Sequence, residues 1–125
     1  MALMPTLLVD DVEASSRWYQ HLLGAQSAHG GPDFEMLTLD GELFLQLHRA
    51  HADEHGVSLP EGVPRGAGVM LYCPVVDVRA AHKNAVSMGA NVEGEPEFID
   101  LAHHTEFVVH DPDGYALALY QPGNV

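Results

Sequence analysis

The sequence predicts an α+β fold made of two βαβββ modules in one chain. Three observations support this prediction. Residues 7–24 carry the signals of a strand, a capped helix and a glycine stop, in that order. Residues 71–89 repeat the same order of signals. Both segments are followed by runs in which apolar residues alternate, a pattern typical of strands.

The first segment begins with a β-type run at residues 7–9 and continues into a helix. Asp10 and Asp11 are both of a residue type that caps helix N-termini, and Glu13 lies three positions after Asp10, as in a capping box. Gly24 is expected to end the helix in the left-handed conformation. The helix face that we expect to be buried contains Val12, Ser15, Tyr19, Leu22 and Leu23, with Trp18 at its border.

The second segment matches the first at a fixed spacing. Asp77 follows Asp11 at the same distance along the chain at which Val78 follows Val12. Gly89 is expected to end the second helix. Few residues are identical between the two segments, but the order of their signals is the same. This repetition indicates an internal duplication of about half the chain.

Alternating runs supply the remaining strands. Residues 25–33 form a glycine-rich connection, and residues 34–39 and 42–48 are two runs joined by Asp40-Gly41, a strong signal for a tight hairpin. We expect the helix-facing side to carry Leu37, Leu39, Leu43, Leu45 and Leu47. The opposite face then carries Met36, Thr38, Phe44, Gln46 and His48. In the second half, the expected strands are residues 91–100, 105–110 and 115–120.

The segment between the halves, residues 51–66, has no hydrophobic periodicity and contains Pro60 and Pro64. We therefore predict one domain, residues 1–125, that consists of module one (1–50), a linker (51–66) and module two (67–125). A chain of this length has room for one domain with a substantial core.

The composition limits the partners. The chain has 18 acidic and 5 basic residues and a formal net charge of −13, which argues against a nucleic-acid partner. An acidic surface is compatible with a cationic small ligand, but it also simply confers solubility. Cys73 is the only cysteine, which fits a reducing compartment. No signal peptide and no apolar run of membrane length is seen, so we expect a cytoplasmic protein without a membrane partner.

Three stretches resemble the vicinal oxygen chelate superfamily, which contains glyoxalase I, extradiol dioxygenases and bleomycin-resistance proteins. They are VDDVEASSRWYQHLLG, VVDVRAAHKNAVSMGANV and EFVVHDPDGYALALYQP, and together they span nearly the whole chain in the expected order. The resemblance implies that the mixed sheets of the two modules curl around a central cavity, with the helices on the outer face. It also implies a homodimer. Because many different activities share this fold, the resemblance alone assigns none of them.

The resemblance further implies where a metal would be bound. Metal-dependent members place two ligands per module on cavity-facing strand positions, which here fall at Met4, Gln46, Met70 and Ala118. Such members use His and Glu, whereas a thioether is soft, an amide is a weak ligand and alanine is no ligand. We therefore expect neither a bound metal nor another cofactor.

The expected site is a ligand-binding cavity in which no residue has a catalytic role. Methionine and aromatic side chains would line it, and a few polar side chains would orient the ligand, with Glu106 as the acidic candidate for a cation. An alternative is that the apolar residues only fill a packed core. The predicted ligand-binding residues are Met4, Met36, Thr38, Phe44, Gln46, His48, Met70, Tyr72, Glu106, Ala118 and Tyr120.

These observations favour a metal-free protein that binds a small aromatic or cationic organic molecule without turning it over, as in antibiotic resistance by sequestration. Two alternatives stay open. One is an enzyme, either a divalent-metal lyase, isomerase or dioxygenase with non-standard ligands or a metal-independent isomerase. The other is a packed domain with an interaction role. His48, His103 and His104 are the histidines that would have to be considered for a metal site.

Overall fold

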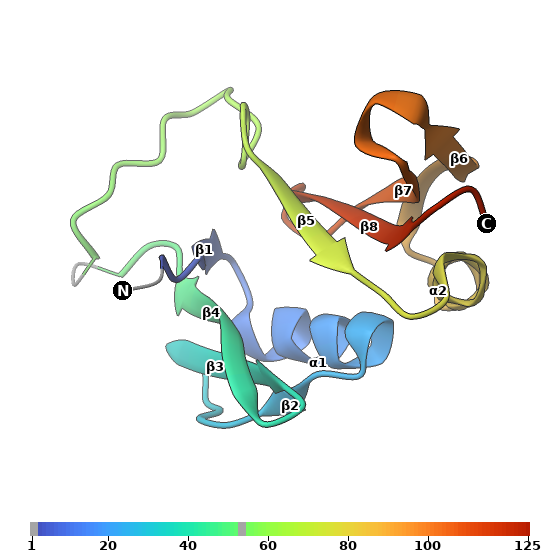
Figure 1. The fold of residues 1–125 in the computed structure, drawn as a ribbon. Helices are drawn as coiled ribbons and strands as arrows, with labels where there is room; N and C mark the ends of the chain where they lie inside the picture. The colour runs from blue at the N-terminus through green and yellow to red at the C-terminus, as the bar shows by residue number, and fades with distance from the viewer. Residues whose placement is uncertain (1–2, 53–54) are drawn as a thin grey trace. The chain divides into compact units, whose positions relative to one another are not determined.

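The computed structural model describes residues 3–52 and 55–125. The chain divides into two compact units, Met1–Gly62 and Val63–Val125. Each unit has the element order β-α-β-β-β, so the predicted α+β class with two βαβββ modules is confirmed (Figure 1).

The two units have the same sheet topology. Sheet A of the first unit has the strand order β1-β4-β3-β2, and sheet B of the second unit has the order β5-β8-β7-β6. In both sheets the first strand is parallel to the last, and the other pairs are antiparallel. The elements of the first unit are β1 (Thr6–Val9), α1 (Val12–Leu23), β2 (Gln26–Ser27), β3 (Phe34–Leu39) and β4 (Glu42–Arg49). Those of the second are β5 (Met70–Pro74), α2 (Val78–Ser87), β6 (Asn91–Ile99), the short 3-10 helix η2 (Asp100–Ala102), β7 (His104–His110) and β8 (Ala116–Pro122).

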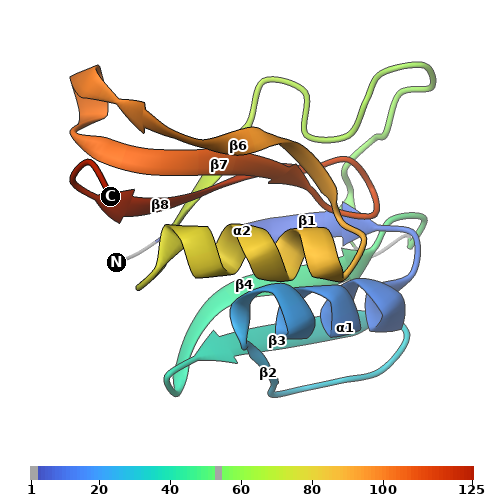
Figure 2. The same ribbon diagram turned by 90° about the vertical axis from the view of Figure 1, so that its right-hand side faces the viewer.

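One helix packs on one face of each sheet. In the first unit α1 contacts β2, β3 and β4, and in the second α2 contacts β6, β7 and β8 (Figure 2). The buried apolar side chains lie at these layers, among them Tyr19, Leu37 and Leu47 in the first unit and Phe107 and Leu119 in the second. Within the part of the chain that the structure describes, no helix is long and apolar enough to span a membrane.

The strand register supports the internal duplication. Thr6 of β1 pairs with Gln46 of β4. Tyr72 of β5 follows Thr6 at the same spacing that separates the two aspartate caps. It pairs with Ala118 of β8. Gln46 and Ala118 therefore occupy equivalent positions in their modules. Sequence spacing alone could not place this last-strand equivalence, because the connections between the strands differ in length.

The helix caps are also repeated. Asp11 accepts a hydrogen bond from the amide of Ala14 at 3.0 Å, and Asp77 accepts one from Ala80 at 3.0 Å. The capping box that paired Asp10 with Glu13 is therefore wrong, because Asp11 is the N-cap of α1. At the other end, Gly24 has φ of +73°, as expected of a left-handed cap.

Two details of sheet A differ from the expectation. The predicted glycine-rich connection contains the short strand β2, which pairs with β3 and completes the four-stranded sheet. The β3–β4 register also shifts between Leu37 and Thr38, so that Leu37 faces Leu45 but Thr38 faces Leu43. A bulge interrupts strict alternation, and Leu43 therefore does not share the face of Leu45.

Part of the predicted linker folds with the second unit. Arg65 Nη1 forms an ion pair with Asp113 Oδ1 at 2.8 Å, and the two side chains are 18% and 5% exposed. Gly66 lies so close to Tyr115 that a Cβ atom at this glycine would be 2.6 Å from Cδ1 of the ring. Residues 53 and 54 of the predicted linker lie outside the described residues.

Candidate functional site

The face of sheet B opposite α2, here called the open face of sheet B, carries the most distinctive group of side chains. Along β7, the buried Thr105 and Phe107 alternate with the partly exposed His104 and Glu106. Since Phe107 belongs to the core beneath the helix, His104 and Glu106 point to the opposite side. Tyr120 of β8 lies directly opposite Glu106 in the antiparallel register and shares this face.

A hydrogen-bonded pair occupies this open face. His104 Nε2 lies 2.6 Å from Glu106 Oε1, and the two side chains are only 12% and 14% exposed. When the imidazole is neutral, an Nε2–H that donates to the carboxylate leaves Nδ1 as the unprotonated nitrogen. The carboxylate thus fixes the orientation of the imidazole.

Two phenol rings pack beside this pair. The ring of Tyr120 is 4.8 Å from that of His104, with an interplanar angle of 32°. The ring of Tyr72 lies 6.0 Å from Tyr120 and 6.1 Å from His104, and its residue is 54% exposed. The three rings therefore form an aromatic cluster on one face, with one ring that reaches solvent. The aromatic cluster comprises Tyr72, His104 and Tyr120.

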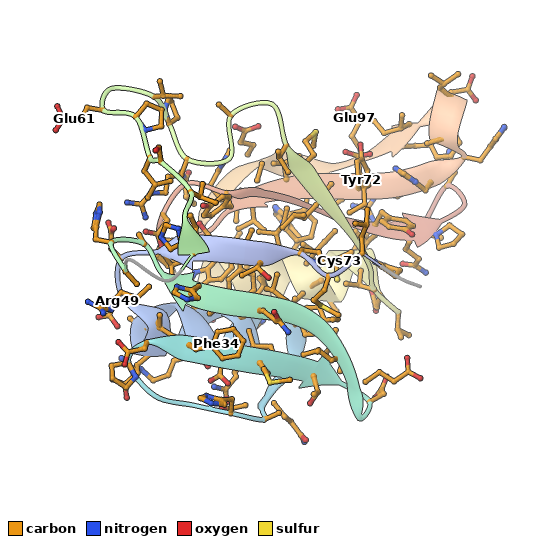
Figure 3. All side chains as sticks on the ribbon, turned by 90° about the vertical axis from the view of Figure 1, so that its left-hand side faces the viewer. Phe34, Arg49, Glu61, Tyr72, Cys73 and Glu97 are labelled. Carbon is orange, nitrogen blue, oxygen red and sulfur yellow. The ribbon has the colours of Figure 1, made fainter. Side chains whose placement is uncertain are left out.

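Strand pairing brings further ionisable groups to sheet B. Glu97 of β6 is directly opposite Glu106, and Glu97 and Tyr72 can be followed in Figure 3. Like charges directly opposite each other on neighbouring strands repel. A second imidazole–carboxylate pair, His110 Nε2 with Glu93 Oε1 at 2.8 Å, lies farther along the same two strands. Sequence reasoning missed Glu97, because only the β6–β7 register reveals its position.

The corresponding open face of sheet A carries Met36, Gln46 and His48. Gln46 pairs with Met36 on one side and Thr6 on the other, and the Thr6 hydroxyl donates to Gln46 Oε1 at 3.2 Å. His48 pairs with Phe34, and their rings are 6.1 Å apart. Thr6 and Phe34 were not predicted, and alternation from Met36 and Gln46 would have found them.

The predicted residues divide between the two units. Sheet B brings together Tyr72, Glu106, Ala118 and Tyr120 on neighbouring strands, and Met70 lies two residues before Tyr72 on the exposed edge strand β5. On sheet A, Thr38 lies beyond the register shift and Phe44 has no partner on β3. Met4 precedes β1.

The four positions implied by the resemblance do not fit a divalent metal. Ala118 is fully buried and has no donor atom, Met70 offers a thioether, and the amide oxygen of Gln46 already accepts the Thr6 hydroxyl. Within residues 3–52 and 55–125, no group of three or more His, Cys, Asp or Glu side chains is arranged to hold a metal ion.

One buried carboxylate has a different role. Glu35 of β3 is 2% exposed and accepts five hydrogen bonds, from the hydroxyls of Ser16 and Ser27 and the amides of residues 29, 30 and 36. Burial alone would raise the pKa of Glu35, but hydrogen bonds from Gly30, Ser27, Ser16 and His29 outweigh it and hold the pKa below the ordinary 4.5. Glu35 therefore fixes the connection between α1 and β3.

The single thiol, Cys73, lies on β5 beside the exposed Tyr72 but points to the other face of the strand. Burial raises the pKa of Cys73. A raised pKa keeps the thiol protonated at neutral pH, so Cys73 is a poor nucleophile.

Comparison with known proteins agrees with this architecture. The sequence model of the Glyoxalase/Bleomycin resistance protein/Dioxygenase superfamily matches residues 3–119. The chain therefore belongs to this superfamily. No curated protein matches it in a sequence comparison.

Solved structures resemble the whole chain. A glyoxalase-related enzyme from Fulvimarina pelagi has a TM-score of 0.79 at 20% identity, over 97% of this chain and 87% of that chain. A glyoxalase/bleomycin resistance protein/dioxygenase from Nocardioides has a TM-score of 0.76 at 19% identity, over 99% and 85%. TioX from Micromonospora sp. ML1 has a TM-score of 0.72 at 15% identity, over 100% and 98%. At these identities the similarity shows the fold and not the activity.

Proposed function

We propose that this protein binds a small organic molecule that is aromatic and cationic, and that it sequesters the molecule without turning it over. The open face of sheet B is the proposed contact surface. Tyr72, Tyr120 and Glu106 would hold the ligand there, with His104 behind them. Location in the cytoplasm is part of the same proposal.

The single observation that carries the proposal is the aromatic cluster beside a mostly buried carboxylate. Phenol rings attract a cation through their electron-rich faces, with about 0.5–1 kcal/mol per contact at exposed sites and about 2 kcal/mol in desolvated ones. Flat aromatic groups stack on the same rings. The net charge of −13 raises the local concentration of a cation near the protein.

A calorimetric screen tests the proposal with matched pairs of compounds. Each planar aromatic cation is titrated beside a neutral compound of the same shape, and the protein is purified without chelator. We expect the cation of each pair to bind more tightly. If no compound of the panel bound, or if elemental analysis found a stoichiometric transition metal, the result would contradict the proposal and favour an enzyme of the same superfamily.

Substitution of Glu106 separates the roles of charge and stacking. Glu106→Gln removes the charge but keeps the shape, so we expect affinity for a bound cation to fall roughly tenfold and affinity for its neutral partner to stay unchanged. Glu93→Gln is the matched control, because Glu93 also pairs with a histidine on β7 but lies outside the aromatic cluster. Equal losses in both variants would show a general effect of net charge.

We also propose that the protein forms a homodimer, as the superfamily resemblance implies. Multi-angle light scattering of the purified chain should give twice the 13.5 kDa mass of one chain. A mass of one chain at all concentrations that allow detection would contradict this part of the proposal.

A further inference from the structure

The carboxylate proposed to attract the ligand is already hydrogen-bonded to an imidazole. His104 Nε2 and Glu106 Oε1 are 2.6 Å apart, and both side chains are mostly buried. We propose that His104 makes the affinity for an organic cation dependent on pH, with weaker binding when the imidazole is protonated. This inference rests on the proposed function, and it adds the regulation of the same contact surface.

The charge of the pair changes while its hydrogen bond remains. With neutral His104, the pair has a charge of −1, and Nε2–H still donates to Glu106. Protonation occurs at Nδ1, which makes no hydrogen bond within the described residues, and it brings the pair to neutrality. A ligand cation on the aromatic cluster then meets a second positive charge instead of a net negative one.

The ring stacking brings this charge close to the proposed ligand. Because the rings of Tyr120 and Tyr72 lie 4.8 Å and 6.1 Å from that of His104, a cation on either ring is separated from the imidazolium by that ring alone. The His104 and Glu106 side chains are mostly buried, and charges on buried groups are screened less than charges in open solvent. Repulsion at such a distance is therefore expected to exceed that between two fully exposed charges.

The ionisable groups that sheet B places around His104 on the open face are carboxylates and phenols. On β7 its neighbour on this face is Glu106, on β6 Glu97 lies opposite Glu106, and on β8 and β5 the rings of Tyr120 and Tyr72 carry phenols. Histidine is the side chain whose charge ordinarily changes between about pH 5 and pH 8.

The test uses phenyltrimethylammonium, whose charge does not change with pH, and tert-butylbenzene, its neutral isostere. We expect the dissociation constant of phenyltrimethylammonium to fall roughly tenfold between about pH 5 and pH 8, and that of tert-butylbenzene to stay constant. The change of the dissociation constant with pH is here called the slope. A slope of equal size for both compounds would contradict the inference, because it would reflect a change in the protein rather than in the charge of His104.

Two variants locate the slope. His104→Phe keeps a ring against Tyr120 but cannot be protonated, so the slope should disappear while the cation still binds. His110→Phe is the matched control, because His110 pairs with Glu93 on the same two strands away from the cluster, and here the slope should remain. Retention of the slope in His104→Phe, or its loss in His110→Phe, would contradict the assignment. If His104→Phe does not fold, the comparison of the two compounds on the unaltered protein still decides.

The two proposals fail in different ways. If phenyltrimethylammonium does not bind at any pH, the proposed function fails for this class of cation and the inference fails with it. If it binds with the same affinity across the pH range, only the role of His104 is wrong.

Discussion

Glu35→Ala is expected to lower the free energy of unfolding by about 3–4 kcal/mol, because it leaves several buried donors without a partner. The carboxylate accepts five hydrogen bonds that tie α1, β2 and the loop before β3 to the strand. Urea unfolding measures the loss. Glu42→Ala is the control, since Glu42 is an exposed residue of the neighbouring strand and should cost less than about 0.5 kcal/mol.

The same carboxylate makes stability depend on pH. The pKa of Glu35 is lower in the folded protein than its ordinary 4.5, so the unfolded chain holds the proton more tightly. The stabilising contribution of Glu35 is therefore fully present above the ordinary pKa and is lost as the pH falls through the lower folded value. We expect the stability difference between the unaltered protein and Glu35→Gln to be constant near neutral pH and to narrow in acid. A difference that widens in acid would contradict the direction of this pKa shift.

Gly66→Ala is expected to destabilise the second unit by about 3 kcal/mol, as the sum of backbone strain and a steric clash. Gly66 has φ of +74°, which costs a residue with a Cβ about 1 kcal/mol. In addition, the new Cβ would be 2.6 Å from Cδ1 and 3.3 Å from Cε1 of Tyr115, so the ring would have to move. Overpacking of this kind costs about 1–3 kcal/mol.

Gly68→Ala is the matched control for this clash. Gly68 has φ of +80°, but no atom lies within 4 Å of the position of a new Cβ. Gly68→Ala should therefore lower the free energy of unfolding only by the backbone strain, about 1 kcal/mol. Thermal unfolding of both variants gives the difference. Equal losses would show that the contact of Gly66 with Tyr115 does not constrain the segment before β5.

The repeated signals made most of the fold predictable. A strand, an aspartate cap, an amphipathic helix and a glycine recur in the same order in the two halves, and both copies fold as that order requires. The short strand β2 was not predictable, because two residues carry no periodicity. The bulge in β4 was also missed, since an unbroken run of alternating leucines does not indicate that one residue of the strand lacks a partner on β3.

The site was less predictable than the fold. Alternation placed Tyr72, Ala118 and Tyr120 on one face correctly, because all three lie in uninterrupted strands. The pairing of His104 with Glu106 follows from the start of β7 at His104, one residue earlier than the sequence indicated. The position of Glu97 depends on a register that shifts between Glu93 and Glu97, and no local pattern reveals such a shift.

The most direct test of the account is to map the bound cation on the protein. In ¹H–¹⁵N spectra of the labelled chain, phenyltrimethylammonium should perturb residues of β5, β7 and β8, with the largest changes around Tyr72, His104 and Tyr120. The amide signals of the connection between α1 and β3, which Glu35 holds, should not shift. Perturbations confined to other parts of the chain, or a spectrum that does not change at saturating concentration, would contradict the account.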